Sequence, residues 1–487
     1  MIHSSVNDSI TISVVIPSHD RASSVLRLLT CLNTQRGHAE DYASSDFEVI
    51  VIADGCSDGT SALLQESIDA ARWSFPLTII DHETARGSGI ARNAGAAAAR
   101  GTTLLFIDDD IEPFPGMLVE HTSRHAVAQQ LNQQLVLVGA PVPVRGAGAS
   151  FEHVAAWGWW EQQFERMSER GHRFTHDEIF TGVLSVSTAV FRDIGGFDVA
   201  LTHCHEDLEL GLRLLRANVR VGFTRVGGGI HHDVRGIRRL LPRKVAEGRA
   251  DVLLLQRWPE LVRVSPLTQC ALPDQPAHRL LRDSAFMMAS GVDALLESVA
   301  LPLLRLFEQL KWRSAWRALQ GAVLFHSYWR GAAVQVGSRH TLCTLLNECE
   351  VAADAWVDGT THLVLDLADG IEAAEKLLDE RRPDAITVTI RDLHVGSSIA
   401  PVNAERLHGG HVRRVLATSL AHELRFALSM CELHATDVAT LPAAAPRRSL
   451  AAALAITSSR ANDDSPAQAP AEERLRTVRA TRHEHDG

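Results

Sequence analysis

The sequence lacks several features that would place the protein in other classes. No window reaches the roughly 18 uninterrupted apolar residues of a membrane span. The first residues, MIHSSVNDSI, contain no basic region followed by an apolar core, so they do not indicate a secretory signal. The seven cysteines are far apart and include no CxxC pair. We therefore expect a cytoplasmic protein with reduced thiols.

An excess of basic residues is also missing. Lys and Arg number 48 against 59 Asp and Glu, a net charge of −11. Because a general nucleic-acid binder must neutralise phosphates over a wide face, we expect no nucleic-acid partner. A chain of 487 residues is long for one core and suggests several domains. We expect a catalytic domain at 1–265, a helical segment at 266–340, a small α+β module at 341–441 and a disordered tail at 442–487.

The first hundred residues alternate short apolar runs with amphipathic segments, which predicts an α/β fold. Strands separated by single helices run parallel, so their carboxyl ends meet at one edge of the sheet. The clusters SHDR, DGCSDG, HETARG and DDD follow the strands and would line one crevice, where open α/β sheets bind ligands. We expect strands at 11–17, 48–54, 76–82 and 102–110 and helices at 22–35, 61–72 and 88–100, the second capped by Ser57 and Asp58.

Three consecutive carboxylates, Asp108, Asp109 and Asp110, follow the apolar run LLFI. Adjacent carboxylates repel one another, so the run indicates either a bound cation or a solvated acidic turn. The Gly-rich GSGIARNAG does not fit a dinucleotide loop, because Arg92 stands where the third glycine of GxGxxG belongs. A nucleotide whose diphosphate is bridged by a metal ion accounts for the carboxylates better.

Several motifs together resemble the family 2 glycosyltransferases with a GT-A fold, over roughly residues 10 to 260. In order, they are SVVIPSHDR, VIADGCSDGT, RGSGIARNAG, the DxD-containing FIDDDIEPFPG, FTGVLSVSTAVFRDIGGFDVAL and HEDLELGLRL. The resemblance implies a Rossmann-like, mostly parallel sheet flanked by helices. It also implies metal-dependent transfer of a sugar, with inversion, from a nucleoside-diphosphate sugar to a hydroxyl acceptor.

The resemblance also assigns the metal site. It implies Asp110 and Asp108 as carboxylate ligands and His231 as an imidazole ligand; a solvated pair of His231 and His232 is the alternative. Oxygen ligands suit Mg²⁺ or Mn²⁺, and an imidazole favours Mn²⁺. Because side chains alternate along a strand, we expect Asp109 to face the other way.

The nucleotide-sugar site is the next assignment. An arginine beside the crevice can contact the diphosphate or hold a carboxylate in place, and for Arg92 pairing with an acidic neighbour is equally supported. Asp54 ends the second strand, where its carboxylate can accept a hydrogen bond from the nucleobase. The residues implied for this site are Pro17, Arg21, Asp54, Arg86, Arg92, Asp108 and Asp109.

Glu206 and Asp207 open a helix with many leucines, near its positive end. Helix capping explains one acid there, but the preceding TGVLS and GGFD segments match the acceptor side of the family. The resemblance therefore implies Asp207 as the catalytic base and Glu206 as its orienting neighbour.

The acceptor is less well defined by the sequence. Trp157, Trp159 and Trp160 either stack on sugar rings or pack in a core. Gln256-Arg257-Trp258 lacks the spacing of the Q-x-x-R-W signature of processive synthases, which favours a single transfer. We expect a hydroxyl acceptor that is a saccharide, a lipid-linked molecule or a natural product.

Residues 301–330 are locally basic and contain aromatic side chains suited to a bilayer interface. Peripheral contact at the inner face of the membrane is one hypothesis; helices packed inside the protein are the alternative, because the apolar positions form no single stripe. The residues concerned are Arg305, Lys311, Trp312, Arg313, Trp316, Arg317, Tyr328, Trp329 and Arg330.

Two other functions also fit part of the sequence. A nucleotidyltransferase would use acidic metal ligands on a parallel sheet, but it would place a Gly-rich basic loop after the first strand, where SHDRAS stands. A catalytically inactive scaffold would bind the sugar nucleotide without transfer. Retention of the DDD and ED motifs and of the later histidine argues against that scaffold.

Overall fold

The computed structural model describes residues 10–35, 47–144, 150–201, 204–232, 237–270, 276–287, 291–358 and 360–436. The chain divides into two compact units, Met1–Leu420 and Ala421–Gly487. In the second unit the described residues form helix α15 (Ala421–Thr436). None of the described helices is both long and apolar enough to cross a membrane. The predicted disorder of 442–487 concerns residues outside the described ranges.

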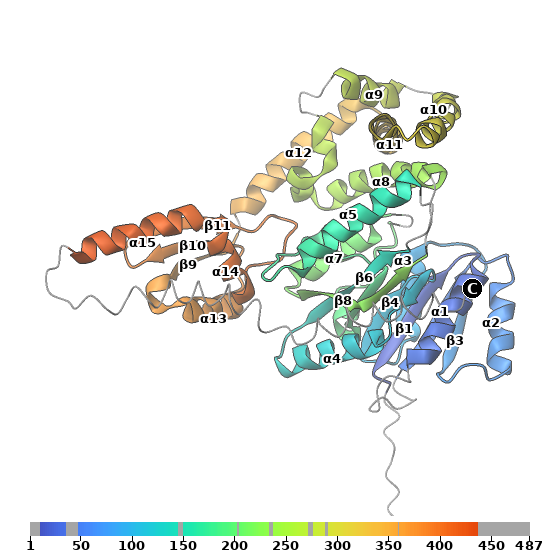
Figure 1. Cartoon of the computed structure of the whole chain (residues 1–487), viewed down its shortest axis with the longest axis horizontal. Helices are drawn as coiled ribbons and strands as arrows, with labels where there is room; N and C mark the ends of the chain where they lie inside the picture. The colour runs from blue at the N-terminus through green and yellow to red at the C-terminus, as the bar shows by residue number, and fades with distance from the viewer. Residues whose placement is uncertain are drawn as a thin grey trace, which may run out of the picture. The chain divides into compact units, whose positions relative to one another are not determined.

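An eight-stranded mixed sheet forms the centre of the first unit (Figure 1), in the order β3-β2-β1-β4-β7-β6-β8-β5. Strands β1 to β4 run parallel as predicted, whereas β7 is antiparallel to both β4 and β6. The fold class is confirmed as α/β. The strands are β1 (Ile12–Ser18), β2 (Phe47–Asp54), β3 (Leu77–His82), β4 (Thr103–Ile107), β5 (Ile111–Pro113), β6 (Leu135–Pro143), β7 (Val183–Ser187) and β8 (Arg220–His231).

Helices cover both faces of this sheet. Successive residues of a strand point to opposite faces, so Val15 packs on one side and Val14 and Ile16 on the other. One face packs against α3, α6 and α7, and the other against α1, α2 and α4. The bounds are α1 (Ala22–Thr34), α2 (Thr60–Asp69), α3 (Ser88–Ala98), α4 (Met117–Gln130), α5 (Phe151–Ser168), η2 (His176–Glu178), α6 (Thr188–Asp193) and α7 (Glu206–Arg216).

The predicted helices are present with small shifts of their ends. In α1 the buried residues are those with the predicted helical spacing, Val25, Leu28, Leu29 and Leu32. The predicted caps of α2 were wrong in part, because the helix begins at Thr60 after Gly59, whose φ is 83°. Asp58 still contributes, since its Oδ1 accepts a hydrogen bond of 3.1 Å from the Thr60 amide.

A helical segment follows the sheet. Helices α8 and α11 cross at very close range: a Cβ at Gly248 would lie 2.0 Å from the Tyr328 carbonyl oxygen, and one at Gly331 would lie 1.9 Å from that of Val245. Only glycine permits this approach, which fixes the two helices against each other. The elements are α8 (Ile237–Arg257), η3 (Pro259–Val264), η4 (Pro266–Cys270), α9 (Pro276–Met287), α10 (Gly291–Gln309), α11 (Arg313–Val336) and α12 (Arg339–Asp358).

The aromatic residues of 301–330 are largely internal. Trp316 and Trp329 are buried, and the Tyr328 hydroxyl donates a hydrogen bond to Asp251. Trp312 is 55% exposed. Three of the four aromatics therefore occupy the positions expected of helices packed inside the protein. Membrane contact stays a prediction, which now depends on Trp312 and the basic residues.

A small module completes the first unit. Its three strands are ordered β11-β10-β9, and it joins the first domain through a bridge between Thr175 and Ala404 and a 2.8 Å hydrogen bond from the Glu405 amide to the Phe174 carbonyl. Strands β10 and β11 are antiparallel and are joined by a turn in which Arg391 has a φ of 55°. The elements are β9 (His362–Asp366), η5 (Leu367–Asp369), α13 (Ile371–Arg381), β10 (Ala385–Ile390), β11 (Leu393–Ile399) and α14 (Gly409–Ala417).

Candidate active site

The loops at the carboxyl ends of β1 and β2 are joined to each other. The Asp20 carboxylate accepts hydrogen bonds from the backbone amides of Ser57, at 2.6 Å, and Asp58, at 3.2 Å. The Asp58 carboxylate accepts one of 3.1 Å from the Ala22 amide. The crevice predicted at this edge of the sheet therefore has a fixed rim on one side.

Asp54 holds the next loop. Its carboxylate accepts hydrogen bonds of 3.0 Å from the Arg86 amide and 2.8 Å from the Gly87 amide, and it lies 2.7 Å from Nδ1 of His82. A nucleobase would therefore compete with protein donors for Asp54, and the predicted contact between them stays a prediction. The Arg86 side chain is exposed, and no ion pair of its guanidinium occurs within the described ranges. Pro17 lies in β1, in register with Ile52.

The three consecutive aspartates do not alternate in direction. Asp109 and Asp110 both contact Nη1 of Arg21, at 3.0 and 2.6 Å, and Asp108 instead pairs with Arg92 at 2.7 Å. The expectation that Asp109 faces away was wrong, because β4 ends at Ile107 and the alternation of a strand does not continue through the turn. Ser18, which sequence reasoning missed, donates a 2.6 Å hydrogen bond to Asp109.

The two neighbouring carboxyls differ in acidity. Burial raises the pKa of Asp109 to about 6, although Arg21 opposes the rise. Burial also opposes ionisation of Asp110, but its contacts with His231 and Arg21 hold its pKa at about 2. Asp110 is therefore ionised at neutral pH and suited to bind a cation.

Asp110 and His231 fit the divalent metal that the fold family implies. Strand β5 pairs with β8 so that Ile111 lies opposite His231, which brings Nε2 of His231 to 3.3 Å from Oδ1 of Asp110. Two ligands at about 2.1 Å from one octahedral ion lie about 3 Å apart, so this spacing suits Mg²⁺ or Mn²⁺. Nε2 of His232 instead lies 2.8 Å from Glu112, so the two neighbouring histidines have different carboxylate partners.

Arg92 lies between Asp108, a predicted metal ligand, and Glu206, a predicted catalytic-site residue. Its guanidinium, 4% exposed as a residue, contacts Asp108 at 2.7 Å and Glu206 at 3.1 Å. The Ser88 hydroxyl donates a further hydrogen bond of 2.5 Å to Glu206. Arg92 thus has the acidic partners that were one of its two predicted roles. The structure pairs Arg21 with Asp109 and Asp110, and Arg92 with Asp108 and Glu206.

Asp207 lies in the first turn of α7. Among the described residues, its carboxylate accepts one hydrogen bond, of 2.9 Å, from the Leu208 amide. Burial and the neighbouring Glu206 raise its pKa to about 6, and His205 and Arg92 oppose that rise. A carboxylate with a pKa near neutrality and few protein donors has the properties of a general base.

A second group beside α7 was not predicted. His205, which precedes the acidic pair, has a left-handed φ of 62°, and its Nδ1 lies 3.0 Å from Asp251 of α8. The Tyr328 hydroxyl, from α11, donates a 2.5 Å hydrogen bond to the other Asp251 oxygen. No local motif joins these three residues, so only the tertiary structure reveals the group.

The tryptophan cluster is mainly structural. Trp160 stacks on Phe164, with ring centroids 5.4 Å apart, and meets Phe180 edge to face. Trp159 is 54% exposed and is the member that keeps an accessible ring. Core packing therefore describes Trp160, and sugar stacking stays a prediction for Trp159.

Known proteins resemble the part of the chain that contains this site. The family model described as "Glycosyl transferase family 2" matches residues 13–146. This match supports assignment of these residues to the family 2 glycosyltransferases. A glycosyltransferase of Haemophilus influenzae, itself uncharacterized, is 28% identical over 207 residues, which are 42% of this chain and 62% of that protein. The O-antigen biosynthesis protein RfbC of Myxococcus xanthus is 28% identical over 242 residues, 46% of this chain and 17% of that protein.

The chain thus spans less than two thirds of either relative. Among solved structures, TarS of S. aureus is 19% identical, with a TM-score of 0.37, 64% of this chain covered and 91% of that one. A mannosyltransferase of Pyrobaculum calidifontis in complex with GDP-Man and Mn²⁺ is 14% identical, with a TM-score of 0.38, 72% of this chain covered and 84% of that one. Likeness at this level carries no argument about substrate or mechanism. The glycosyltransferase assignment depends on the sequence family and on the geometry of the crevice.

Proposed function

We propose that this protein transfers one sugar from a nucleoside-diphosphate sugar to a hydroxyl acceptor, with inversion and with a divalent cation. The observation that carries the proposal is the run of Asp108, Asp109 and Asp110 after β4, in which Asp109 and Asp110 pair with Arg21 while Asp108 shares Arg92 with Glu206. It would place a cation site for a diphosphate and a candidate base in the same crevice. The family of residues 13–146 supports the reaction class.

The donor would lie along the strand ends. Arg21 and Arg92 carry charges suited to the diphosphate, and both now pair with carboxylates that the ligand would have to displace or share. Asp110 and His231 would hold the cation, which when bound offsets the negative charge on the departing diphosphate. Mn²⁺ is the better choice because His231 offers an imidazole.

The acceptor would approach from the side of α7. Asp207 would remove the proton of the attacking hydroxyl while the new glycosidic bond forms and the bond to the diphosphate breaks. Glu206 is held by Ser88 and Arg92, so its role is to fix the start of α7 beside the donor. Attack opposite the departing group inverts the anomeric centre.

A donor screen with product analysis tests this proposal. Nucleoside-diphosphate sugars are first compared for the rise in melting temperature that they cause with Mn²⁺, and the best donor is then offered to an array of saccharides and lipid or natural-product alcohols. An α-linked donor should give a β-linked product in the NMR spectrum of the anomeric proton. A product that retains the configuration, or the absence of any stabilising nucleotide sugar, would contradict the proposal.

A further inference from the structure

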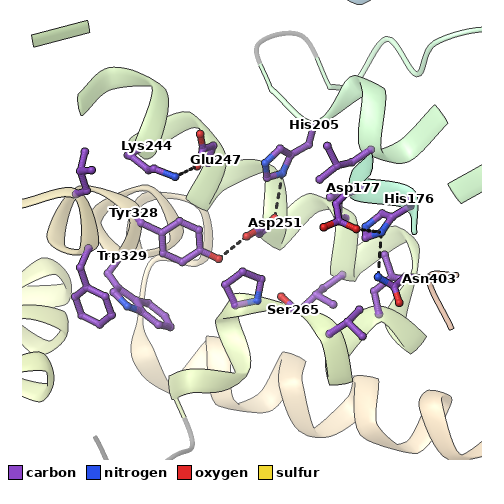
Figure 2. Close-up of a pocket in the computed structure, with 18 residues that line it drawn as sticks. His176, Asp177, His205, Lys244, Glu247, Asp251, Ser265, Tyr328, Trp329 and Asn403 are labelled. Atoms are coloured by element: carbon purple, nitrogen blue, oxygen red, sulfur yellow. Dashed lines mark hydrogen bonds and ion pairs between the residues drawn. The ribbon is translucent and has the colours of Figure 1, made fainter. Parts of the chain in front are cut away.

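A cavity of about 470 Å³ lies behind the start of α7, between η2, α7, α8, η3 and α11 (Figure 2). One wall is apolar and includes Leu255, Leu261, Phe325 and Trp329. Such a volume, with an apolar wall and a few convergent polar groups, is typical of a site for a small organic ligand. The cavity is built mainly by helices that follow residues 13–146, the range that the family model matches.

The polar end of this cavity adjoins the candidate base. His205 and Leu208, which flank Glu206 and Asp207 in the sequence, both line it. Asp251 forms an ion pair with His205 and accepts a hydrogen bond from the Tyr328 hydroxyl, as the dashed lines in Figure 2 show. A ligand in the cavity would therefore touch the residues that hold the first turn of α7.

Two of the helices around the cavity, α8 and α11, pack at backbone contact. Tyr328 belongs to the turn of α11 that meets Gly248 of α8 at backbone contact, three residues before Asp251. His205 keeps a left-handed conformation that a non-glycine residue adopts at some cost in energy, and its partner Asp251 compensates for it. The described helices thus already form the cavity through their own contacts.

Among the described residues that line the cavity, the cationic groups are already paired with carboxylates. Lys244 pairs with Glu247, and His205 pairs with Asp251. The remaining charged lining residue is Asp177, which lies 3.7 Å from His176. Burial lowers the pKa of His176, so this imidazole is neutral and does not offset the carboxylate. A phosphate would find neither an unpaired ammonium nor a guanidinium among the lining residues described.

We propose that this cavity binds the apolar body of the acceptor, and that the acceptor is an uncharged amphipathic alcohol such as an alkyl or aryl glycoside. The proposal rests on the transferase function proposed above and specifies its acceptor. An acceptor whose phosphate must enter this cavity is disfavoured, because Lys244 and His205 already pair with Glu247 and Asp251 and Asp177 adds a further negative charge. The hydroxyl-bearing head would lie toward His205 and α7, and the apolar part would lie along Phe325 and Trp329.

Photolabelling of the full chain tests the proposal. The probe is octyl glucoside with a diazirine on its alkyl chain, used below its micellar concentration, and labelled residues are mapped by mass spectrometry. Labels are expected on α11 around Phe325 and on η3. Unlabelled octyl glucoside should compete, and octyl phosphate should compete roughly tenfold less well. Labels only at exposed sites such as Trp312, or equal competition by octyl phosphate, would overturn the proposal.

Two variants sharpen this test. Ser265→Trp places a large side chain at the cavity lining and should reduce labelling of α11 strongly. Arg263→Trp is the matched control, because Arg263 lies on η3 but does not line the cavity, and its labelling should equal that of the original protein. Equal labelling in both variants would overturn the proposal. If Ser265→Trp does not fold, the comparison of the two octyl competitors in the unaltered protein still decides.

A separate measurement distinguishes this inference from the proposed function. Calorimetry with UDP and GDP in Mn²⁺ reports on the donor site alone. Nucleotide binding without labelling of the cavity would contradict the acceptor proposal and leave the transferase proposal standing. Labelling of the cavity without any nucleotide binding would contradict the transferase proposal, and with it the interpretation of the ligand as an acceptor.

Discussion

Buried carboxylates lie among cationic or imidazole groups in two regions of the molecule, the crevice at the strand ends and the module at the end of the first unit. In the module, Oε1 of Glu405 is 3.5 Å from Nε2 of His408 and 3.7 Å from Arg382, and its Oε2 is 3.6 Å from Nε2 of His411. Glu405, His408 and His411 each offer one ligand atom, and these atoms lie within 4.8 Å of one another. This arrangement would also suit a metal ion. By distance alone the two regions look alike.

The remaining contacts of the histidines separate the two regions. Nδ1 of His408 accepts a hydrogen bond from the Gly410 amide, and Nδ1 of His411 accepts one from the His408 amide. A neutral imidazole has one donor and one acceptor, so each Nε2 carries its proton toward Glu405 and has no lone pair for a metal. Nε2 of His231 also faces a carboxylate, at 3.3 Å from Asp110, but the His231 side chain is 20% exposed at the crevice, whereas that of His411 is 1% exposed. We infer a stabilising role for the module cluster and a ligand role for the crevice.

The largest effect is expected from Asp207→Asn. Amide replacement keeps the shape and removes the base, so transfer should fall by roughly 10²- to 10⁴-fold while donor affinity is retained. Rates with the best donor and acceptor, together with calorimetry of the donor, measure both quantities. Near-normal turnover would remove Asp207 from the mechanism.

Arg92→Ala should destabilise the first domain, because it leaves the buried Glu206 without its cation. Loss of one partner of a buried ion pair costs about 3–5 kcal/mol. Arg86→Ala is the control: that side chain is exposed, and its loss should change the free energy of unfolding by less than about 0.5 kcal/mol. Urea denaturation compares the two variants, and equal stability would mean that Arg92 is not structurally coupled to Glu206.

Glu405→Gln should destabilise the module without affecting nucleotide binding. Although burial opposes ionisation, His408 and His411 hold the pKa of Glu405 at about 2 in the folded state, against 4.5 ordinarily. The ionised carboxylate therefore adds about 3 kcal/mol of stability above pH 4.5, which is lost as the pH falls toward about 2.

Hydrogen exchange of the α14 amides measures this loss at neutral pH. Glu372→Gln is the control, because the Glu372 side chain is 78% exposed on the same module. If Glu405→Gln instead abolishes nucleotide binding and leaves α14 protected, the contrast between the two regions is wrong.

The dependence of transfer on pH should follow the ionisation of Asp207. Its pKa of about 6 means that the base is protonated, and inactive, at lower pH. The rate at saturating donor should therefore fall about tenfold for each pH unit below about 6. A rate that is constant from about pH 5 to 8 would show that another group limits the reaction.

The sequence predicts most of the first four strands and their helices, because hydrophobic periodicity and the strand-helix order are local properties. Asp110 and His231 are predicted as metal ligands only through the family resemblance, and the structure brings these distant residues within 3.3 Å of each other. The antiparallel β7, inserted between β4 and β6, has no local signal because strand pairing depends on distant partners. The predicted direction of the Asp109 side chain was wrong for a similar reason, since β4 ends at Ile107 and a turn follows it.

The group formed by His205, Asp251 and Tyr328 marks the limit of sequence reasoning. Its members come from three helical elements, and each of them alone is compatible with an ordinary surface or core position. Their contact depends on the close crossing of α8 and α11, which two glycines permit. No spacing in the sequence indicates which helix faces which.

Calorimetry of UDP and GDP binding to the original protein and to Asp110→Asn, with Mn²⁺ and with a chelator, tests the central claim most directly. The claim is that Asp110 holds the cation that binds a nucleoside diphosphate in the crevice. We expect tight binding only for the original protein with Mn²⁺, and loss of the metal dependence in Asp110→Asn. Glu112→Gln, whose carboxylate pairs with His232, should retain it. Metal-linked affinity that is unchanged in Asp110→Asn would contradict the account.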